Sequence, residues 1–141
     1  MRHPTASVAA ADAASSIRVQ GRAAQLAGHR VMIVEDEFLL ALTLEDDLRD
    51  AGAVPLGPYA ALAETLAAIE KENFDLAVLD INLDGEMSYP AADALIARGV
   101  PFVLLTGYAG TSLPERFREC PRLSKPYDVA GLIETIRELS T

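Results

Sequence analysis

Short apolar runs alternate along the chain with longer segments whose apolar residues have helical spacing. The runs predict five strands, at residues 31–34, 54–57, 74–79, 102–105 and 122–124. The intervening segments predict helices at residues 37–51, 61–71, 89–97, 114–119 and 128–139. In the first helix, Leu40, Leu44 and Leu48 recur every four residues and form the inward stripe. Strands that alternate with helices indicate an α/β fold with a parallel sheet.

Residues at the segment ends refine this assignment. Gly52 is placed to end the first helix, and Asp128 to cap the start of the last one. Pro55 and Pro58 favour an edge position for the second strand, because proline cannot donate to a sheet ladder. The fourth helix has room for barely more than one turn, with Pro114 at its first position.

Polar side chains follow four of the predicted strands, at the point where each strand ends. These are Glu35-Asp36-Glu37, Asp80, Thr106-Gly107 and Lys125-Pro126. In parallel sheets the carboxyl ends of the strands lie at one edge, and ligands bind there. The pattern therefore predicts a site that gathers carboxylates, one hydroxyl and one amine.

This set of groups fits phosphoryl chemistry. Asp80 is the candidate nucleophile, because a carboxylate can accept a phosphoryl group as a mixed anhydride. Attack by an anion on a phosphoryl dianion requires charge neutralisation, which Mg²⁺ bound to oxygen ligands supplies. Asp36 is placed to be the second carboxylate ligand, and Glu35 to act through water. Thr106 and Lys125 can each contact a phosphoryl oxygen.

The other acidic residues near the strand ends have simpler interpretations. Glu37 is expected to open the first helix. Asp84, Glu86 and Asp93 are expected to be solvated. Cys120 is the only cysteine, so it cannot form an internal disulfide, and it is expected to be a small buried hydrophobe.

Length and charge suggest two parts in the chain. A length of 141 residues, half of them hydrophobic, fits one domain. Residues 1–28 have few large apolar residues and no period, so we expect a disordered N-terminal extension before a domain at residues 29–141. Residues 1–30 carry four arginines and one aspartate, whereas the whole chain has a net charge of −9. So acidic a body is a poor candidate for nucleic-acid binding, and no apolar run is long enough to span a membrane.

Taken together, the chain from residue 30 to residue 139 resembles the receiver domain of two-component response regulators. The resemblance rests on the strand-end motifs Ile33-Val34-Glu35-Asp36-Glu37 and Leu79-Asp80-Ile81-Asn82-Leu83, on Thr106, and on Lys125-Pro126. It implies a flavodoxin-like, doubly wound five-stranded parallel sheet in the order 2-1-3-4-5, with helices on both faces. It also implies phosphorylation of Asp80 by a histidine kinase, and Mg²⁺ bound by Asp36, Asp80 and the main-chain carbonyl of Asn82.

Two departures from most receivers point to a subgroup. The position three residues before the lysine, usually aromatic, is Arg122, and Leu83-Asp84-Gly85-Glu86 stands where many receivers have a methionine-proline turn. The segment Leu105-Thr106-Gly107-Tyr108-Ala109-Gly110 partly matches the motif of the FAT GUY subgroup. An arginine cannot fill an apolar slot without burying its charge. We therefore expect the switch to involve residues 107–119 instead, with Tyr108 shielding the anhydride.

The resemblance also implies partners. Subgroup members are often single-domain proteins that accompany HWE-type histidine kinases, so a kinase or a phosphotransfer protein is the expected donor. A downstream protein is the expected target, with no nucleic acid or membrane bound. A cytoplasmic monomer or weak dimer is expected, with only self-phosphorylation and self-dephosphorylation chemistry.

Two alternatives remain open. A haloacid-dehalogenase-type phosphatase also uses a strand-end aspartate and Mg²⁺, but it needs a second acid two residues later, where this chain has Asn82. The second alternative is a receiver fold that acts only as a binding module, independently of phosphorylation.

Overall fold

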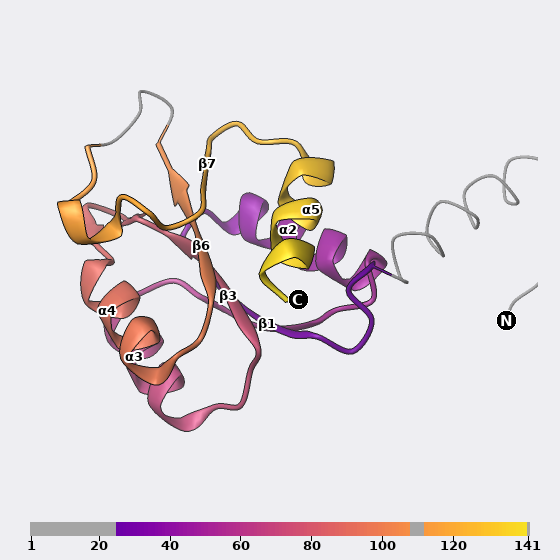
Figure 1. Cartoon of the computed structure of the whole chain (residues 1–141), viewed down its shortest axis with the longest axis horizontal. Coiled ribbons are helices and arrows are strands. Elements are labelled where there is room, and N and C mark those ends of the chain that lie inside the picture. Colours follow the sequence, from indigo (N-terminus) through magenta and orange to yellow (C-terminus); the bar gives the residue numbers. More distant parts are fainter. Residues whose placement is uncertain (1–24, 108–111, 141) are drawn as a thin grey trace, which may run out of the picture.

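A five-stranded parallel sheet organises the protein (Figure 1). The computed structural model describes residues 25–107 and 112–140. Its sheet has the order β2-β1-β3-β6-β7, which is the expected order 2-1-3-4-5 when only these strands are counted. The strands are β1 (Arg30–Val34), β2 (Val54–Tyr59), β3 (Leu76–Asp80), β6 (Phe102–Thr106) and β7 (Arg122–Ser124). The predicted strand positions and the edge position of β2 are thus confirmed.

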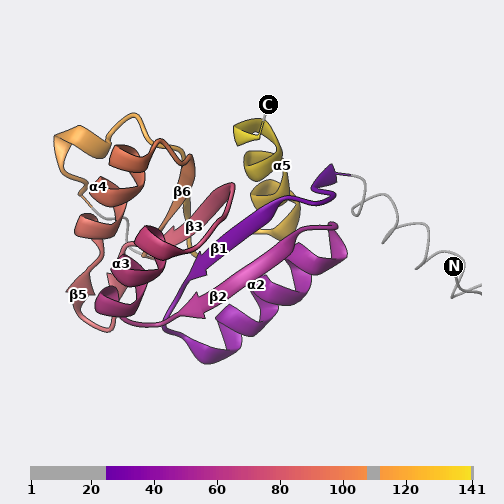
Figure 2. The ribbon, with the colours of Figure 1, turned by 90° about the horizontal axis from the view of Figure 1, so that it is seen from below.

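Four α-helices cover the two faces of the sheet. They are α2 (Phe38–Asp50), α3 (Leu62–Lys71), α4 (Tyr89–Arg98) and α5 (Val129–Leu139). Helices α2 and α5 lie on one face, and α3 and α4 lie on the other (Figure 2). This arrangement confirms the flavodoxin-like architecture. None of the helices in the described part of the chain is both long and apolar enough to cross a membrane.

The two cores follow from the two-residue repeat of the strands. In β1, Val31 and Ile33 face the α2 and α5 layer, whereas Met32 and Val34 face the α3 and α4 layer. All residues of β3 and β6 are buried. Central strands covered on both faces need such continuous apolar runs, which is why the runs were visible in the sequence.

The helix ends agree with the predicted caps. Asp128 precedes α5, and its Oδ1 accepts a hydrogen bond from the Gly131 amide at 2.6 Å. Gly52 follows α2 with φ of +92°, the left-handed conformation that glycine adopts at low cost.

The fourth predicted helix is wrong as an α-helix. The structure has only a single 3₁₀ turn, η2 (Glu115–Phe117), in that segment. Phe117 is fully buried and stacks on Tyr89 of α4 with ring centroids 5.6 Å apart. One turn gains little from helix propagation. The packing of the Phe117 ring against Tyr89 therefore holds this segment in place.

A two-stranded hairpin follows β3 and was not predicted. It consists of β4 (Asn82–Leu83) and β5 (Glu86–Met87), which pair antiparallel. Asp84 and Gly85 in its turn have φ of +52° and +92°. Two positive φ values are the hallmark of a tight hairpin turn, for which Asp-Gly is a favoured pair. Asp84 and Glu86 are exposed, as expected.

The N-terminal boundary lies earlier than expected. Leu26 is fully buried beneath α2 and α5, and its amide donates a hydrogen bond to the Ala51 carbonyl oxygen at 3.0 Å. The domain therefore includes Leu26, and the expected boundary between residues 28 and 29 is too late. A single anchoring leucine has no period, so the pattern could not reveal it. Residues 1–24 of the expected extension lie outside the described residues.

We predict that Leu26→Ala lowers the free energy of unfolding by about 2–4 kcal/mol, because it leaves a cavity in the core. Leu39→Ala is the matched control, since Leu39 is 75% exposed, and its effect is expected to stay within about 0.5 kcal/mol. Urea denaturation followed by circular dichroism measures both. Equal effects of the two substitutions would contradict the anchoring role of Leu26.

Candidate functional site

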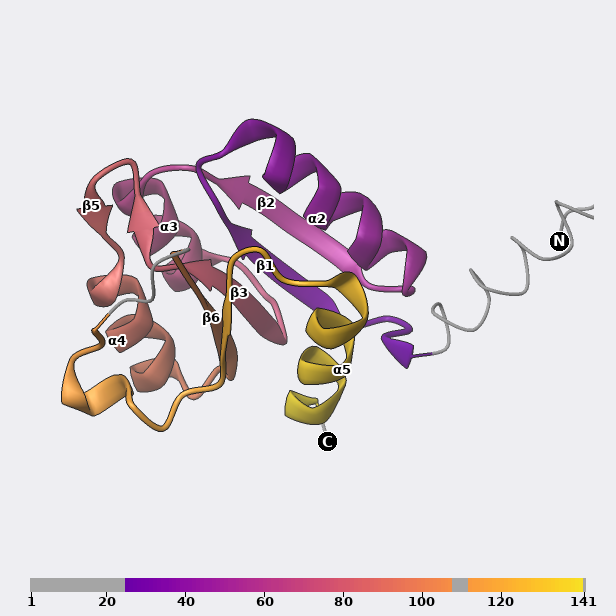
Figure 3. The ribbon, with the colours of Figure 1, turned by 90° about the horizontal axis from the view of Figure 1, so that it is seen from above.

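The carboxyl ends of the parallel strands converge at one edge of the sheet (Figure 3). Glu35 and Asp36 follow β1, whereas Asp80 and Thr106 are the last residues of β3 and β6. A hollow of about 460 Å³ lies at this edge. Asp36, Asp80 and Lys125 are among the residues that line it, so the structure brings the expected nucleophile, second carboxylate and amine together.

Lys125 lies at the centre of this group. Its Nζ is 2.9 Å from Asp80 Oδ2, 3.2 Å from Glu35 Oε1 and 3.5 Å from Glu37 Oε1. Burial by itself lowers the lysine pKa, but the hydrogen bond and charge of Asp80 and the charge of Glu35 outweigh it and raise the pKa above its ordinary value. Lys125 is therefore a permanent cation that the carboxylates surround.

Glu37 does more than the sequence indicated. It precedes α2, as expected, but its side chain makes no hydrogen bond that caps the helix. Its carboxylate contacts Lys125 instead. No local pattern signals this contact, because the two residues are 88 positions apart.

Glu35 is the most buried carboxylate of the site. Its side chain is fully buried, and its Oε2 accepts a hydrogen bond from the Glu37 amide at 3.0 Å. Burial raises the pKa of Glu35 from 4.5 to about 7, and the nearby charge of Asp80 adds to the shift. The Glu37 amide and the Lys125 charge act in the opposite direction. The carboxyl group of Glu35 is thus poised to titrate close to neutrality.

Three carboxylates form a possible cation site. Among the described residues, Glu35, Asp36 and Asp80 bring one carboxylate oxygen each within 4.8 Å of one another. Like charges at this spacing repel one another unless a cation lies between them. An all-oxygen donor set is the set that hard divalent cations such as Mg²⁺ and Ca²⁺ prefer.

The main chain around Asp80 is fixed by its neighbours. The Asn82 amide donates to Asp80 Oδ1 at 3.2 Å, and the Ser88 hydroxyl donates to the Asp80 carbonyl oxygen at 2.6 Å. The Asn82 side chain accepts a hydrogen bond from Gly85 at 2.6 Å and so belongs to the hairpin turn. Ser88 was not singled out in the sequence. Its position just before α4 suggests a helix cap, but nothing local indicates its bond to Asp80.

Thr106 is turned toward β7 in this structure. Its hydroxyl is 3.4 Å from the Leu123 carbonyl oxygen and 3.2 Å from the Ser124 hydroxyl, both hydrogen bonds. Arg122 is exposed and donates to the Arg118 carbonyl oxygen at 3.4 Å, so it fills no apolar slot, as expected. Tyr108 lies outside the described residues, and its expected shielding role stays a prediction.

Two other expectations concern the surroundings of the site. Asp93 is exposed, but it forms a two-point ion pair with Arg116 at 2.9 and 3.0 Å, which joins α4 to η2. Cys120 is only half-buried, so the expectation of a buried hydrophobe is correct only in part. It packs against the α3 and α4 core because the segment after η2 lies at the edge of that layer.

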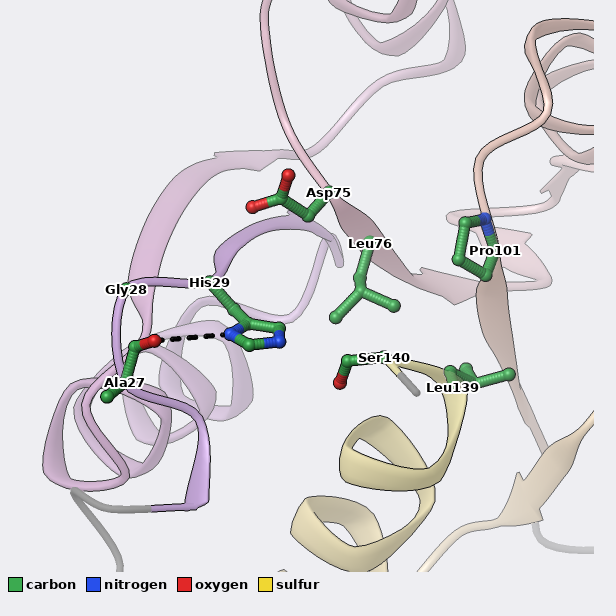
Figure 4. A pocket seen from close by; sticks show the side chains of 8 residues that line it. All are labelled: Ala27, Gly28, His29, Asp75, Leu76, Pro101, Leu139 and Ser140. Atoms are coloured by element: carbon green, nitrogen blue, oxygen red, sulfur yellow. Dashed lines mark hydrogen bonds between the residues drawn. The ribbon is translucent and has the colours of Figure 1, made fainter.

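A second hollow, of about 490 Å³, lies at the opposite edge of the sheet (Figure 4). His29 and Asp75 on its wall already have local partners. Nδ1 of His29 donates to the Ala27 carbonyl oxygen at 3.3 Å, and Asp75 Oδ2 accepts from the Arg30 amide at 2.8 Å. This hollow lacks a cluster of unpaired chemical groups, so the candidate site is the one around Asp80.

Comparisons with known proteins point to one kind of protein. The solution structure of SdrG from Sphingomonas melonis Fr1 is 41% identical and covers 83% of this chain and 98% of its own, with a TM-score of 0.71. A second structure, the BeF3-activated conformation of SdrG from Pseudomonas melonis Fr1, is 39% identical and covers 82% and 98%, with a TM-score of 0.68. A CheY-like response regulator receiver domain protein from Methanospirillum hungatei JF-1 is 28% identical and covers 79% and 93%, with a TM-score of 0.70.

One relative is similar over only part of its length. Transcriptional regulatory protein PdtaR from Mycobacterium tuberculosis is 29% identical over 111 residues, which are 76% of this chain and 54% of that protein. The chain thus spans about half the length of this curated relative. No family model matches the chain.

The raised pKa of Glu35 predicts a pH dependence of stability in the presence of a chelator. Between pH 4.5 and 7 the folded state holds a proton on Glu35 that the unfolded state has lost, so stability falls as pH rises through this window. Glu35→Gln is expected to remove this decrease, which amounts to roughly 1–3 kcal/mol. Urea denaturation of both proteins at several pH values, with EDTA, measures the difference. If the stability of the two proteins changes with pH in the same way, Glu35 is not the group that causes the decrease.

Proposed function

The chain belongs to the receiver-domain family of response regulators, and on that premise we propose that it is a phosphoacceptor that receives a phosphoryl group on Asp80 with Mg²⁺ as cofactor. The observation that carries the proposal is the position of the Asp80 carboxylate, 2.9 Å from the Lys125 ammonium and beside two further carboxylates. The proposed nucleophile, a fixed cation and the carboxylates of the proposed Mg²⁺ site all lie at one hollow, which supports the proposal.

The chemistry follows from these groups. The proposed donor carries the phosphoryl group on a histidine. An oxygen of Asp80 attacks the phosphorus of this group, and the bond between the phosphorus and the imidazole nitrogen of the donor breaks. Lys125 pairs with one phosphoryl oxygen, and this contact partly replaces its present ion pair with Asp80. Thr106 donates to another oxygen once it releases its hydrogen bonds to β7. Thr106 therefore links the chemistry of the site to the edge strand.

Asp36, Asp80 and the main-chain carbonyl of Asn82 are the proposed Mg²⁺ ligands, with Glu35 acting through water. The mutual proximity of Glu35, Asp36 and Asp80 supports this assignment. When bound, the ion supplies positive charge that offsets the repulsion between the carboxylates and the phosphoryl group.

The proposed donor is a histidine kinase or a phosphotransfer protein. For a kinase donor, we propose more specifically the HWE type. The chain's own chemistry is then limited to self-phosphorylation and self-dephosphorylation. We propose that it signals through protein contact or onward phosphotransfer, by conformational changes at residues 107–119. Asn82, where phosphatases of the haloacid dehalogenase type need an acid, argues against steady hydrolysis of phosphomonoesters.

Beryllofluoride, a mimic of the phosphoryl group, tests this function. Since SdrG has a BeF3-activated conformation, we expect Mg²⁺ with beryllofluoride to shift the amide resonances around Asp80, Thr106 and Lys125. Asp80→Asn is expected to abolish both this response and phosphorylation by a donor kinase, because it removes the nucleophile. Asp46→Asn, at an exposed position of α2 outside the hollow, serves as the control. Absence of any response in the unmodified protein would favour a phosphorylation-independent binding module.

Asp36→Asn is predicted to weaken Mg²⁺ binding at least about tenfold, or ~1.4 kcal/mol, because it removes a charged ligand. Isothermal titration calorimetry measures the affinity. The matched control is Asp46→Asn, which removes the same charge from an exposed position of α2. If the two variants lose affinity equally, Asp36 acts only through net charge and is not a ligand.

A further inference from the structure

Two buried side-chain oxygens have no hydrogen-bond partner among the described residues. They are Glu35 Oε1 and the hydroxyl of Tyr127. Glu35 Oε1 lies 3.2 Å from the Lys125 ammonium, but this contact is an ion pair without hydrogen-bond geometry. Buried polar atoms are nearly always hydrogen-bonded, because an unpaired one costs free energy. Two such atoms in one small protein therefore require an explanation.

Both residues lie on the same side of the sheet. Tyr127 comes two residues after Lys125, and its side chain packs against the core beneath α2 and α5. Glu35 comes two residues after Ile33, which faces that same core, and the two-residue repeat of an extended chain directs it to the same face. The two unpaired oxygens thus belong to one layer, next to Lys125.

The charges around the phenol favour a donor role. Burial raises the pKa of Tyr127, and the next largest cause is the negative charge of Glu35. Asp47 and Asp80 raise it further, whereas Lys125 lowers it. The hydroxyl therefore stays protonated and donates, and carboxylates are the acceptors around it.

We propose that Tyr127 is a positioning residue, whose hydroxyl donates a hydrogen bond to one bound water that in turn donates to Oε1 of Glu35. Oε2 of Glu35 is already held by the Glu37 amide at 3.0 Å, so this second bond would fix both oxygens of the carboxylate. Oε1 already forms an ion pair with Lys125 at 3.2 Å, so a carboxylate held at both oxygens keeps its place beside the ammonium fixed. Without the hydroxyl, Oε1 would lose this restraint, and the Glu35 carboxylate could shift relative to Lys125, Asp36 and Asp80.

The hydrogen bond can be tested without any metal or phosphoryl donor. In protein labelled with ¹³C-tyrosine and kept in EDTA at pH 8, the Cζ resonance of Tyr127 reports hydrogen bonding by its hydroxyl. Glu35→Gln is expected to shift this resonance, because an amide is a weaker acceptor than a carboxylate. Asp47→Asn is the comparison, since the negative charge of Asp47 also raises the pKa of Tyr127. A shift with Asp47→Asn alone would overturn the proposed partner.

The consequence for the site rests on the proposed function and is tested separately. Tyr127→Phe keeps the ring and removes only the hydroxyl, and it is expected to weaken Mg²⁺ binding about threefold to tenfold. Tyr59→Phe is the matched control, because Tyr59 is half-buried on β2 and the charges that raise its pKa, after burial, are those of Glu72 and Glu64, outside the site. An unchanged affinity in Tyr127→Phe would overturn the positioning role. Absence of Mg²⁺ binding in the unmodified protein would instead overturn the proposed function, while the EDTA experiment would still decide the hydrogen bond.

Discussion

The arrangement of the site depends on one buried ammonium group. Lys125 lies within 2.9 to 3.5 Å of carboxylates that come from β3 and from the loop after β1. Removing one partner from a buried ion pair costs roughly 3–5 kcal/mol, because a charge is left without compensation in a low dielectric. The same ammonium that lets these carboxylates approach one another is the group that would meet a phosphoryl oxygen. Stability and chemistry therefore use the same contact.

The surrounding fold limits how each group can move. Asp80 is held at the end of a fully buried strand, and Ser88 fixes its carbonyl oxygen. The hydroxyl of Thr106, by contrast, makes its hydrogen bonds to β7, an edge strand of three residues. The nucleophile is thus held by a buried central strand, whereas the Thr106 hydroxyl is bonded to a short edge strand. This difference in restraint fits a site in which Asp80 reacts and Thr106 responds.

Excess negative charge is the second property of the site. Glu35 and Asp80 share one Lys125, with Asp36 beside them, and burial, together with the charge of Asp80, raises the pKa of Glu35 to about 7. Such a group is destabilising when ionised and unpaired, and proteins keep this arrangement mainly where a ligand compensates it. Tyr127 adds a neutral donor on the apolar side of this cluster, where a second cation would be costly to bury.

The sequence by itself determined the strands, most helices, the topology expected for the family and the residues at the strand ends. These properties are local or follow from periodicity: a buried parallel strand must be continuously apolar, and its carboxyl end must meet those of its neighbours. Only the tertiary structure decided the contacts between distant residues, such as Glu37 with Lys125, Ser88 with Asp80, and Leu26 with the α2 and α5 core. The 3₁₀ turn at η2 belongs to the same class, because the packing of Phe117 decides it. The hairpin at Asp84-Gly85 was not predicted, because its flanking strands of two residues are too short to show a period.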